Sequence, residues 1–206
     1  MNNIVLQKAE PDIGFSEEVS EMLWQGCIDW FHPTAERVLM NQETSTAVFF
    51  IRKAQKSDVP LIMSFIKELA LYEKLSYEVV ATEESLTETL FQETSSAEVL
   101  LAYCNDEPVG FALYFHNYST FLGKPGIYLE DLFILEEHRG KGVGRELLKH
   151  LARVAKERNC GRMEWWVLDW NTPAIEFYKS LGAVPMNDWT TFRVTGEALD
   201  RLALND

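Results

Sequence analysis

The sequence is poor in cysteine and positive charge, and it lacks any long apolar run. It contains three cysteines, Cys27, Cys104 and Cys160, whose spacing fits neither a metal site nor a redox pair. Its longest apolar runs, such as Ala47 to Ile51, are as long as a core strand and too short for a membrane span. No basic or apolar stretch typical of a signal peptide opens the chain. We therefore expect a reduced, cytoplasmic protein that binds no metal and does not enter a membrane.

Basic residues are few: 19, against 32 acidic residues, which leaves a net charge of −13. Residues 1–45 alone hold two basic and eight acidic residues. Such a field repels nucleic acid and anionic lipid, and it raises the local concentration of cationic ligands. The balance predicts no nucleic-acid or membrane partner. It is compatible with an amine substrate without being specific for one.

The patterns of secondary structure change at about residue 45. Before it, Ser16 to Trp30 has the capping hydroxyl, early acids and apolar spacing of an amphipathic helix, so residues 1–45 predict an ordered N-terminal arm of unknown function. Residues 46–206 predict one α/β domain. Its expected helices cover 57–75, a shorter segment from 82, 143–159, 173–181 and a short segment from 196. Its expected strands cover 47–52, 98–103, 109–115, 127–135, 162–168 and 190–194, of which the last closes the sheet.

A glycine-rich segment, His138-Arg139-Gly140-Lys141-Gly142-Val143-Gly144-Arg145, lies between an expected strand and the helix expected at 143–159. Alternate glycines allow a tight turn with successive N–H groups facing a ligand, and the helix start adds its positive end. The spacing excludes a P-loop and disfavours a dinucleotide fingerprint. The segment therefore predicts a pyrophosphate-binding turn, with an ordinary glycine-rich connection as the alternative.

Two motifs in this order resemble the GNAT N-acetyltransferase superfamily. Arg139-x-x-Gly142-x-Gly144 matches that family's Gln/Arg-x-x-Gly-x-Gly/Ala signature, and Asn171 to Ala183 matches its second signature around Phe-Tyr and Gly. Tyr128 to Phe133, together with Leu69 to Glu73 and Val167 to Asn171, is similar to a narrower branch, the diamine (spermidine/spermine) and thialysine acetyltransferases. The resemblance runs from about Val48 to Leu204. It implies a single mixed, mostly antiparallel twisted sheet flanked by helices, acetyl-CoA as cofactor, and a homodimer.

The resemblance also implies two catalytic residues. Amine acetylation requires an uncharged nitrogen and a proton for the departing thiolate, and a carboxylate and a phenol can serve these two needs. Glu130 corresponds to the family's base, acting through water, and Tyr178 to its acid. From the residues alone, Glu130 could be a solvated acid at a sheet edge and Tyr178 a core aromatic. Glu130 and Asp131 are adjacent, so their side chains should point to opposite faces unless a bulge redirects them.

The cofactor contacts implied by the resemblance form a larger set. They are the strand backbone at Leu132, Phe133 and Ile134, the turn residues Arg139, Gly140, Lys141, Gly142, Val143, Gly144 and Arg145, and Asn171 with Ala174 at the start of the next helix. Without the resemblance, the first three suit core packing and Asn171 suits a helix cap. For the acceptor, the resemblance implies Tyr72, Glu73, Asp131 and Trp189, an aromatic and carboxylate set that suits a cation.

One departure from the diamine enzymes bears on the acceptor. Those enzymes carry Tyr-Asp-Pro-Trp before the catalytic strand, whereas this chain has Tyr118-Ser119-Thr120-Phe121, as in the thialysine branch. We expect acetyl transfer from acetyl-CoA to a primary amine of a small cationic acceptor, either thialysine- or lysine-like or a polyamine, by direct attack in a ternary complex. Two alternatives stay open: a non-catalytic acyl-CoA-binding regulatory module, and an acetyltransferase of a protein amine or another metabolite.

Overall fold

The computed structural model describes residues 36–39, for which the backbone alone is given, and residues 48–204. The expected helix at Ser16 to Trp30 lies outside these residues. The chain divides into two compact units, the first ending at Trp165 and the second beginning at Trp166. In the described ranges, no helix is long and apolar enough to cross a membrane.

Six strands form one sheet in the order β1-β2-β3-β4-β5-β6. They are β1 (Glu36–Leu39), β2 (Val48–Lys53), β3 (Ala97–Cys104), β4 (Glu107–Ser119), β5 (Lys124–Ile134) and β6 (Met163–Trp165). Neighbours from β1 to β5 are antiparallel, and β6 runs parallel to β5. The predicted mixed, mostly antiparallel sheet is confirmed, and β1 adds a strand from within the expected arm.

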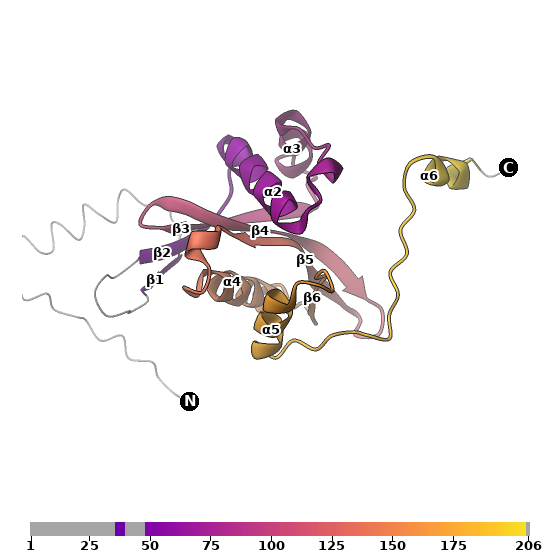
Figure 1. Ribbon diagram of the computed structural model, residues 1–206. Helices are drawn as coiled ribbons and strands as arrows, with labels where there is room; N and C mark the ends of the chain where they lie inside the picture. The colour runs from indigo at the N-terminus through magenta and orange to yellow at the C-terminus, as the bar shows by residue number, and fades with distance from the viewer. Residues whose placement is uncertain (1–35, 40–47, 205–206) are drawn as a thin grey trace, which may run out of the picture. The chain divides into compact units, whose positions relative to one another are not determined.

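Helices cover both faces of this sheet (Figure 1): α2 (Val59–Glu73) and α3 (Glu83–Leu90) lie on one face, and α4 (Val143–Glu157) lies on the other. Short 3-10 turns cover Lys56–Asp58, Ser76–Glu78 and Glu136–His138. The caps follow from the sequence, since Thr82 and Ser85 exchange hydrogen bonds at the start of α3 (3.2 and 2.9 Å). The second unit contains α5 (Thr172–Ser180) and α6 (Gly196–Ala203).

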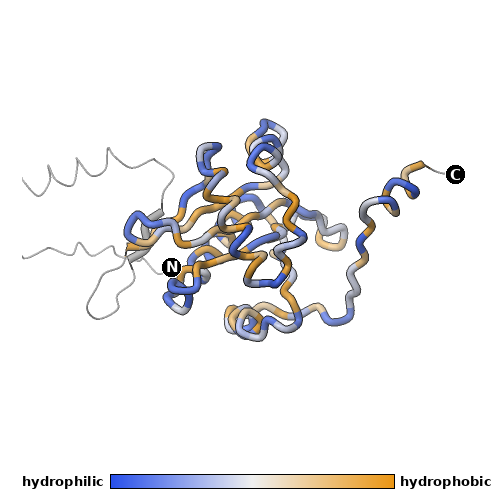
Figure 2. Tube along the Cα trace, turned by 45° about the horizontal axis from the view of Figure 1, so that its top comes forward, coloured by the Kyte–Doolittle hydropathy of each residue, from blue (hydrophilic) through white to orange (hydrophobic). Residues whose placement is uncertain are grey.

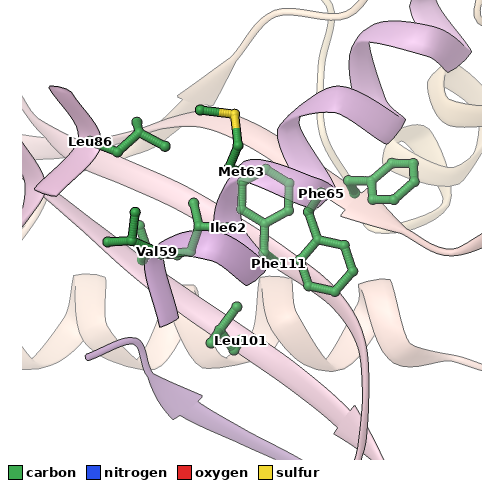
Figure 3. Close-up of a cluster of buried hydrophobic side chains, with 9 residues drawn as sticks. Val59, Ile62, Met63, Phe65, Leu86, Leu101 and Phe111 are labelled. Atoms are coloured by element: carbon green, nitrogen blue, oxygen red, sulfur yellow. The ribbon is translucent and has the colours of Figure 1, made fainter. Parts of the chain in front are cut away.

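The core beneath α2 and α3 is built from aliphatic side chains and three aromatic rings (Figure 3). Phe65 of α2 stacks on Phe111 of β4 with ring centres 5.7 Å apart, and Phe133 of β5 lies 6.2 Å from Phe65. On the other face, Leu147 and Leu151 of α4 are fully buried. Because both faces are covered, hydrophobic residues run along the central strands with little alternation (Figure 2).

Two expected strands differ from the structure. The strand expected at 162–168 is reduced to Met163–Trp165. The prediction of a strand at 190–194 is wrong, because no strand is assigned there and the Phe192 side chain is 90% exposed. Aromatic and β-branched residues favour a strand, but a strand forms only where a neighbour satisfies its backbone groups. The helix expected from residue 196 is confirmed as α6.

Candidate active site

A β-bulge in β5 lies at the two adjacent acids. β4 and β5 pair regularly on either side of this point, but the register skips Glu130. Since side chains alternate along a strand, the extra residue puts Asp131 on the opposite face of the sheet from Leu129. Asp131 thus shares the face of Phe133, which belongs to the core under α2. Opposite faces are expected for Glu130 and Asp131 unless a bulge redirects their side chains. The structure contains such a bulge.

Three of the predicted site residues, Glu73 at the end of α2 and Glu130 and Asp131 on β5, form a group that we call the bulge carboxylates. Asp131 is half-buried, and burial, then repulsion by Glu130 and Glu73, raises the pKa of Asp131 to about 7. Burial also raises the pKa of Glu73. Glu130 is exposed. A half-buried acid that titrates near neutral pH can attract a cation and can exchange a proton.

The pairing of β5 with β6 ends just before the bulge. It covers Ile127 to Leu129, whereas Leu132, Phe133 and Ile134 pair with β4 alone among the described residues. One edge of β5 therefore presents backbone groups that no described strand uses. The resemblance implies a cofactor contact with the backbone at this part of β5, and that contact stays a prediction. The Phe133 side chain is buried in the core, so its predicted contact can only be through the backbone.

The glycine-rich turn has the backbone that its sequence predicts. Gly140 and Gly142 have φ angles of +72° and +89°, which L side chains rarely adopt. Gly142 immediately precedes α4, so the turn lies at the positive end of that helix. Lys141 and Arg145 are exposed, while Val143 is buried against the fold. Such a backbone at a helix start is typical of segments that bind an anion.

The Arg139 side chain makes contacts that the sequence patterns do not indicate. Its Nε donates a hydrogen bond to the Ile134 carbonyl at 2.9 Å. Its guanidinium carbon lies 4.4 Å from the centre of the Tyr72 ring and 5.6 Å from that of Phe133. No local motif links the end of α2 with the turn before α4, so only the fold reveals this contact.

The other predicted residues lie in the second unit. Asn171 is buried, and its Oδ1 accepts a hydrogen bond from the Ala174 N–H (3.3 Å), so it caps α5. Tyr178 is half-buried on the same helix, with its ring centre 5.4 Å from that of Phe177. The Trp189 side chain is 72% exposed. The roles of Asn171, Ala174, Tyr178 and Trp189 toward cofactor and acceptor stay predictions.

Ser119, where the diamine enzymes carry aspartate, has a local role. Its side chain is buried, and its Oγ accepts a hydrogen bond from the Leu122 N–H at 3.2 Å. The hydroxyl thereby closes the turn between β4 and β5. Beside Ser119, Tyr118 of β4 and Phe121 of the turn present their side chains to solvent.

Comparison with known proteins gives the family of the chain. Residues 66–183 match the model of the acetyltransferase (GNAT) family. Thialysine N-epsilon-acetyltransferase of Bos taurus is 40% identical over 168 residues, which cover 76% of this chain and 98% of that protein. L-ornithine N5-acetyltransferase of Arabidopsis thaliana is 33% identical, over 74% of this chain and 86% of that protein. The chain belongs to the GNAT family, and it is an N-acetyltransferase.

Solved structures show the same fold. An integron cassette protein of V. cholerae superposes with a TM-score of 0.64 at 32% identity, covering 75% of this chain and 97% of that chain. An aminoglycoside acetyltransferase from an uncultured soil metagenomic sample gives a TM-score of 0.61 over 71% of this chain and 95% of that one. Its identity of 18% supports the fold alone.

Proposed function

We propose that the protein transfers the acetyl group of acetyl-CoA to a primary amine of a small cationic acceptor, by direct attack within a ternary complex. The observation that carries this proposal is the group of bulge carboxylates beside the unpaired edge of β5. Glu130 and Glu73 repel the negative charge of the half-buried Asp131, so a cation bound beside them would relieve an existing cost. Relatives named for thialysine and ornithine support an acceptor with an amine on a flexible chain.

The residues present fit acetyl-CoA. The glycine-rich turn at the start of α4 would hold the pyrophosphate through its N–H groups, with Lys141 and Arg145 adding charge. The backbone of Leu132 to Ile134 would hold the pantetheine and the thioester oxygen, and Asn171 with Ala174 would contribute from α5. When bound, acetyl-CoA supplies the activated thioester.

Side chains of this protein would transfer the protons and bind the positive charge of the acceptor. A lysine-like ammonium with a pKa of about 10.4 costs roughly 4.6 kcal/mol to neutralise at pH 7. We assign this proton to Glu130, directly or through water, and the binding of the cation to Tyr72, Glu73, Asp131 and Trp189. We assign to Tyr178 the donation of a proton to the departing thiolate.

The acceptor we favour within this class is thialysine- or lysine-like. The aspartate that the diamine enzymes carry is replaced by Ser119, whose buried hydroxyl closes a turn, so a long dication loses one anchoring charge. A lysine-like acceptor brings a carboxylate that an aspartate would repel. We also propose a cytoplasmic location, which the free thiols of Cys104 and Cys160 suit. The resemblance favours a homodimer, and sedimentation equilibrium at twice the chain mass would test it.

A thiol-release assay with acetyl-CoA tests the function against thialysine, lysine, ornithine, spermidine and a peptide with a free N-terminus. We expect turnover with the small amines, and a higher kcat/KM for thialysine than for spermidine. Glu130→Gln and Tyr178→Phe should lower turnover by about 10²–10⁴-fold. Calorimetry should show that both variants still bind coenzyme A.

Two results would contradict the proposal. Coenzyme A binding without thiol release for any amine would favour a regulatory module. Release with the peptide alone would favour a protein acetyltransferase.

A further inference from the structure

One contact joins two parts of the predicted site that the family resemblance treats separately. Arg139 opens the glycine-rich turn, and its guanidinium lies over the ring of Tyr72 in the last turn of α2. The same side chain donates to the Ile134 carbonyl at the end of β5. The ring of Phe133 lies 5.6 Å away. The turn, the end of β5 and the end of α2 therefore meet at one side chain.

This placement defines what Arg139 offers to a ligand. A planar guanidinium that stacks on a ring and bonds a carbonyl has its orientation fixed by protein groups. The Arg139 side chain is thus tied to the end of β5 and to α2, while the exposed side chains of Lys141 and Arg145 add further charge at the turn. The position of the Arg139 backbone and the position of the Tyr72 ring become dependent on each other.

The other end of this contact leads to the acceptor side. Tyr72 is followed by Glu73, one of the two bulge carboxylates whose charge acts on Asp131. The last turn of α2 thus carries both the ring held by Arg139 and an acid of the predicted acceptor site. A ligand that orders the turn orders this end of α2, and thermodynamic linkage requires the converse.

We infer that Arg139 is a positioning residue that couples the cofactor turn to the acceptor side of the site through Tyr72. The inference rests on the proposed function for the identity of its ligands: coenzyme A at the turn and a cationic amine at the bulge carboxylates. Occupancy of the turn favours the arrangement of α2 that binds the amine. Occupancy by the amine tightens the turn around the cofactor.

A double-mutant cycle on coenzyme A affinity, measured by calorimetry without amine, tests the coupling. Tyr72→Leu removes the ring and should weaken binding about two- to fivefold when Arg139 is present, which is the value of an exposed cation–ring contact. In the Arg139→Gln background, Tyr72→Leu should leave the affinity unchanged. Tyr72→Phe keeps the ring and should bind as the wild type does.

Control and alternative variants separate coupling from damage to the fold. Tyr77 is an exposed ring just beyond α2, so Tyr77→Leu is the matched control and should change affinity in neither background. Arg139→Lys keeps the charge but loses the planar stack and the Nε bond, so it should behave like Arg139→Gln. In kinetics, raising acetyl-CoA should lower the KM for thialysine in the wild type and should no longer do so in Arg139→Lys.

Equal effects of Tyr72→Leu in both Arg139 backgrounds, or no effect in either, would overturn the coupling. The outcome is separable from that of the proposed function. A wild type that acetylates an amine but shows independent effects in the cycle refutes the coupling alone. A wild type that shows the coupled pattern with coenzyme A but acetylates no amine supports the coupling and refutes the proposed function.

Discussion

Asp131 is the residue whose chemistry the fold changes most. Its carboxyl lies half-buried on the α2 side of the sheet, and burial with two acidic neighbours raises its pKa to about 7. The unfolded chain ionises the same group near its ordinary pKa of about 3.9. Between these values the folded state holds a proton that the unfolded state has released. Folding stability therefore falls as the pH rises from about 4 to about 7.

Asp131→Asn should remove this loss of stability. We expect the variant to be more stable than the wild type at pH 8 by about 1 kcal/mol or more, which raises Tm by about 2–4 °C. Below pH 4 the two proteins should match, because both then carry a neutral group at this position. Thermal unfolding monitored by circular dichroism between pH 4 and pH 8 measures the difference. A variant with the same pH profile as the wild type would show that Asp131 does not titrate in this range.

At the scale of elements, the glycine-rich turn combines a backbone conformation that favours glycine with a proposed ligand site. Gly142→Ala places a side chain at φ +89°, and Gly123→Ala places one at φ +61° in the turn before β5, where the added Cβ has open space. Each substitution should cost about 1–2 kcal/mol of stability. Only Gly142→Ala should weaken coenzyme A binding, by about tenfold or more. Calorimetry that found equal affinities for the two variants would remove the turn from the cofactor site.

An ion pair between Glu98 of β3 and Arg158, the residue that follows α4, joins these two elements. Arg158 Nη2 donates to Glu98 at 3.0 Å, and Lys53 pairs with the same carboxylate. The hydrogen bond from Arg158 is the main reason that the pKa of Glu98 falls to about 2. A lowered carboxyl pKa contributes stability above the ordinary value of about 4.3, and that contribution disappears as the pH falls toward 2.

Arg158→Gln should therefore destabilise the protein at pH 7 and progressively less below pH 4. The pair is partly exposed, so we expect a loss of about 1 kcal/mol at neutral pH. Arg201→Gln is the matched control, because Arg201 pairs with Glu197 on the exposed surface of α6 and should have no measurable effect. Urea unfolding at pH 7, 5 and 3 measures both variants. A deficit that does not shrink with falling pH would show that packing, and not the ion pair, is what Arg158 contributes.

Elements defined by local patterns are well predicted by the sequence, whereas features that depend on pairing are not. The helices expected from residue 82, at 143–159 and from residue 196 rest on local patterns, and each is present in the structure, as α3, α4 and α6. The bulge at Glu130 depends on register with β4, which no spacing within β5 encodes. The contact between Arg139 and Tyr72 joins distant segments, and the strand expected at 190–194 required a partner that the described sheet does not provide.

For the whole molecule, the net charge of −13 is the property with the clearest kinetic consequence. A negative field attracts a cationic acceptor over a distance set by the Debye length, which falls from about 30 Å at 0.01 M salt to about 10 Å at 0.1 M. The value of kcat/KM for an amine should therefore fall several-fold over this range. Spermidine carries more positive charge than thialysine, so its decrease should be steeper.

Initial rates at subsaturating amine across a NaCl series test this expectation. Sucrose at matched osmolality is the control and should leave kcat/KM unchanged. Because steering acts on encounter and not on the bound complex, kcat at saturation should stay constant. Equal salt dependence for spermidine and thialysine would show that local contacts, and not the field of the whole chain, govern acceptor capture.

The bulge makes Glu130 an insertion in an otherwise regular ladder. Its neighbours Leu129 and Asp131 already occupy consecutive rungs opposite β4, so deletion of this one residue would close the ladder without reversing any other side chain. Glu130, the proposed base, is thus the one residue of β5 whose deletion would leave the rest of the strand in register with β4. A Glu130 deletion variant should fold with a melting temperature at least as high as that of the wild type, and it should lack transferase activity.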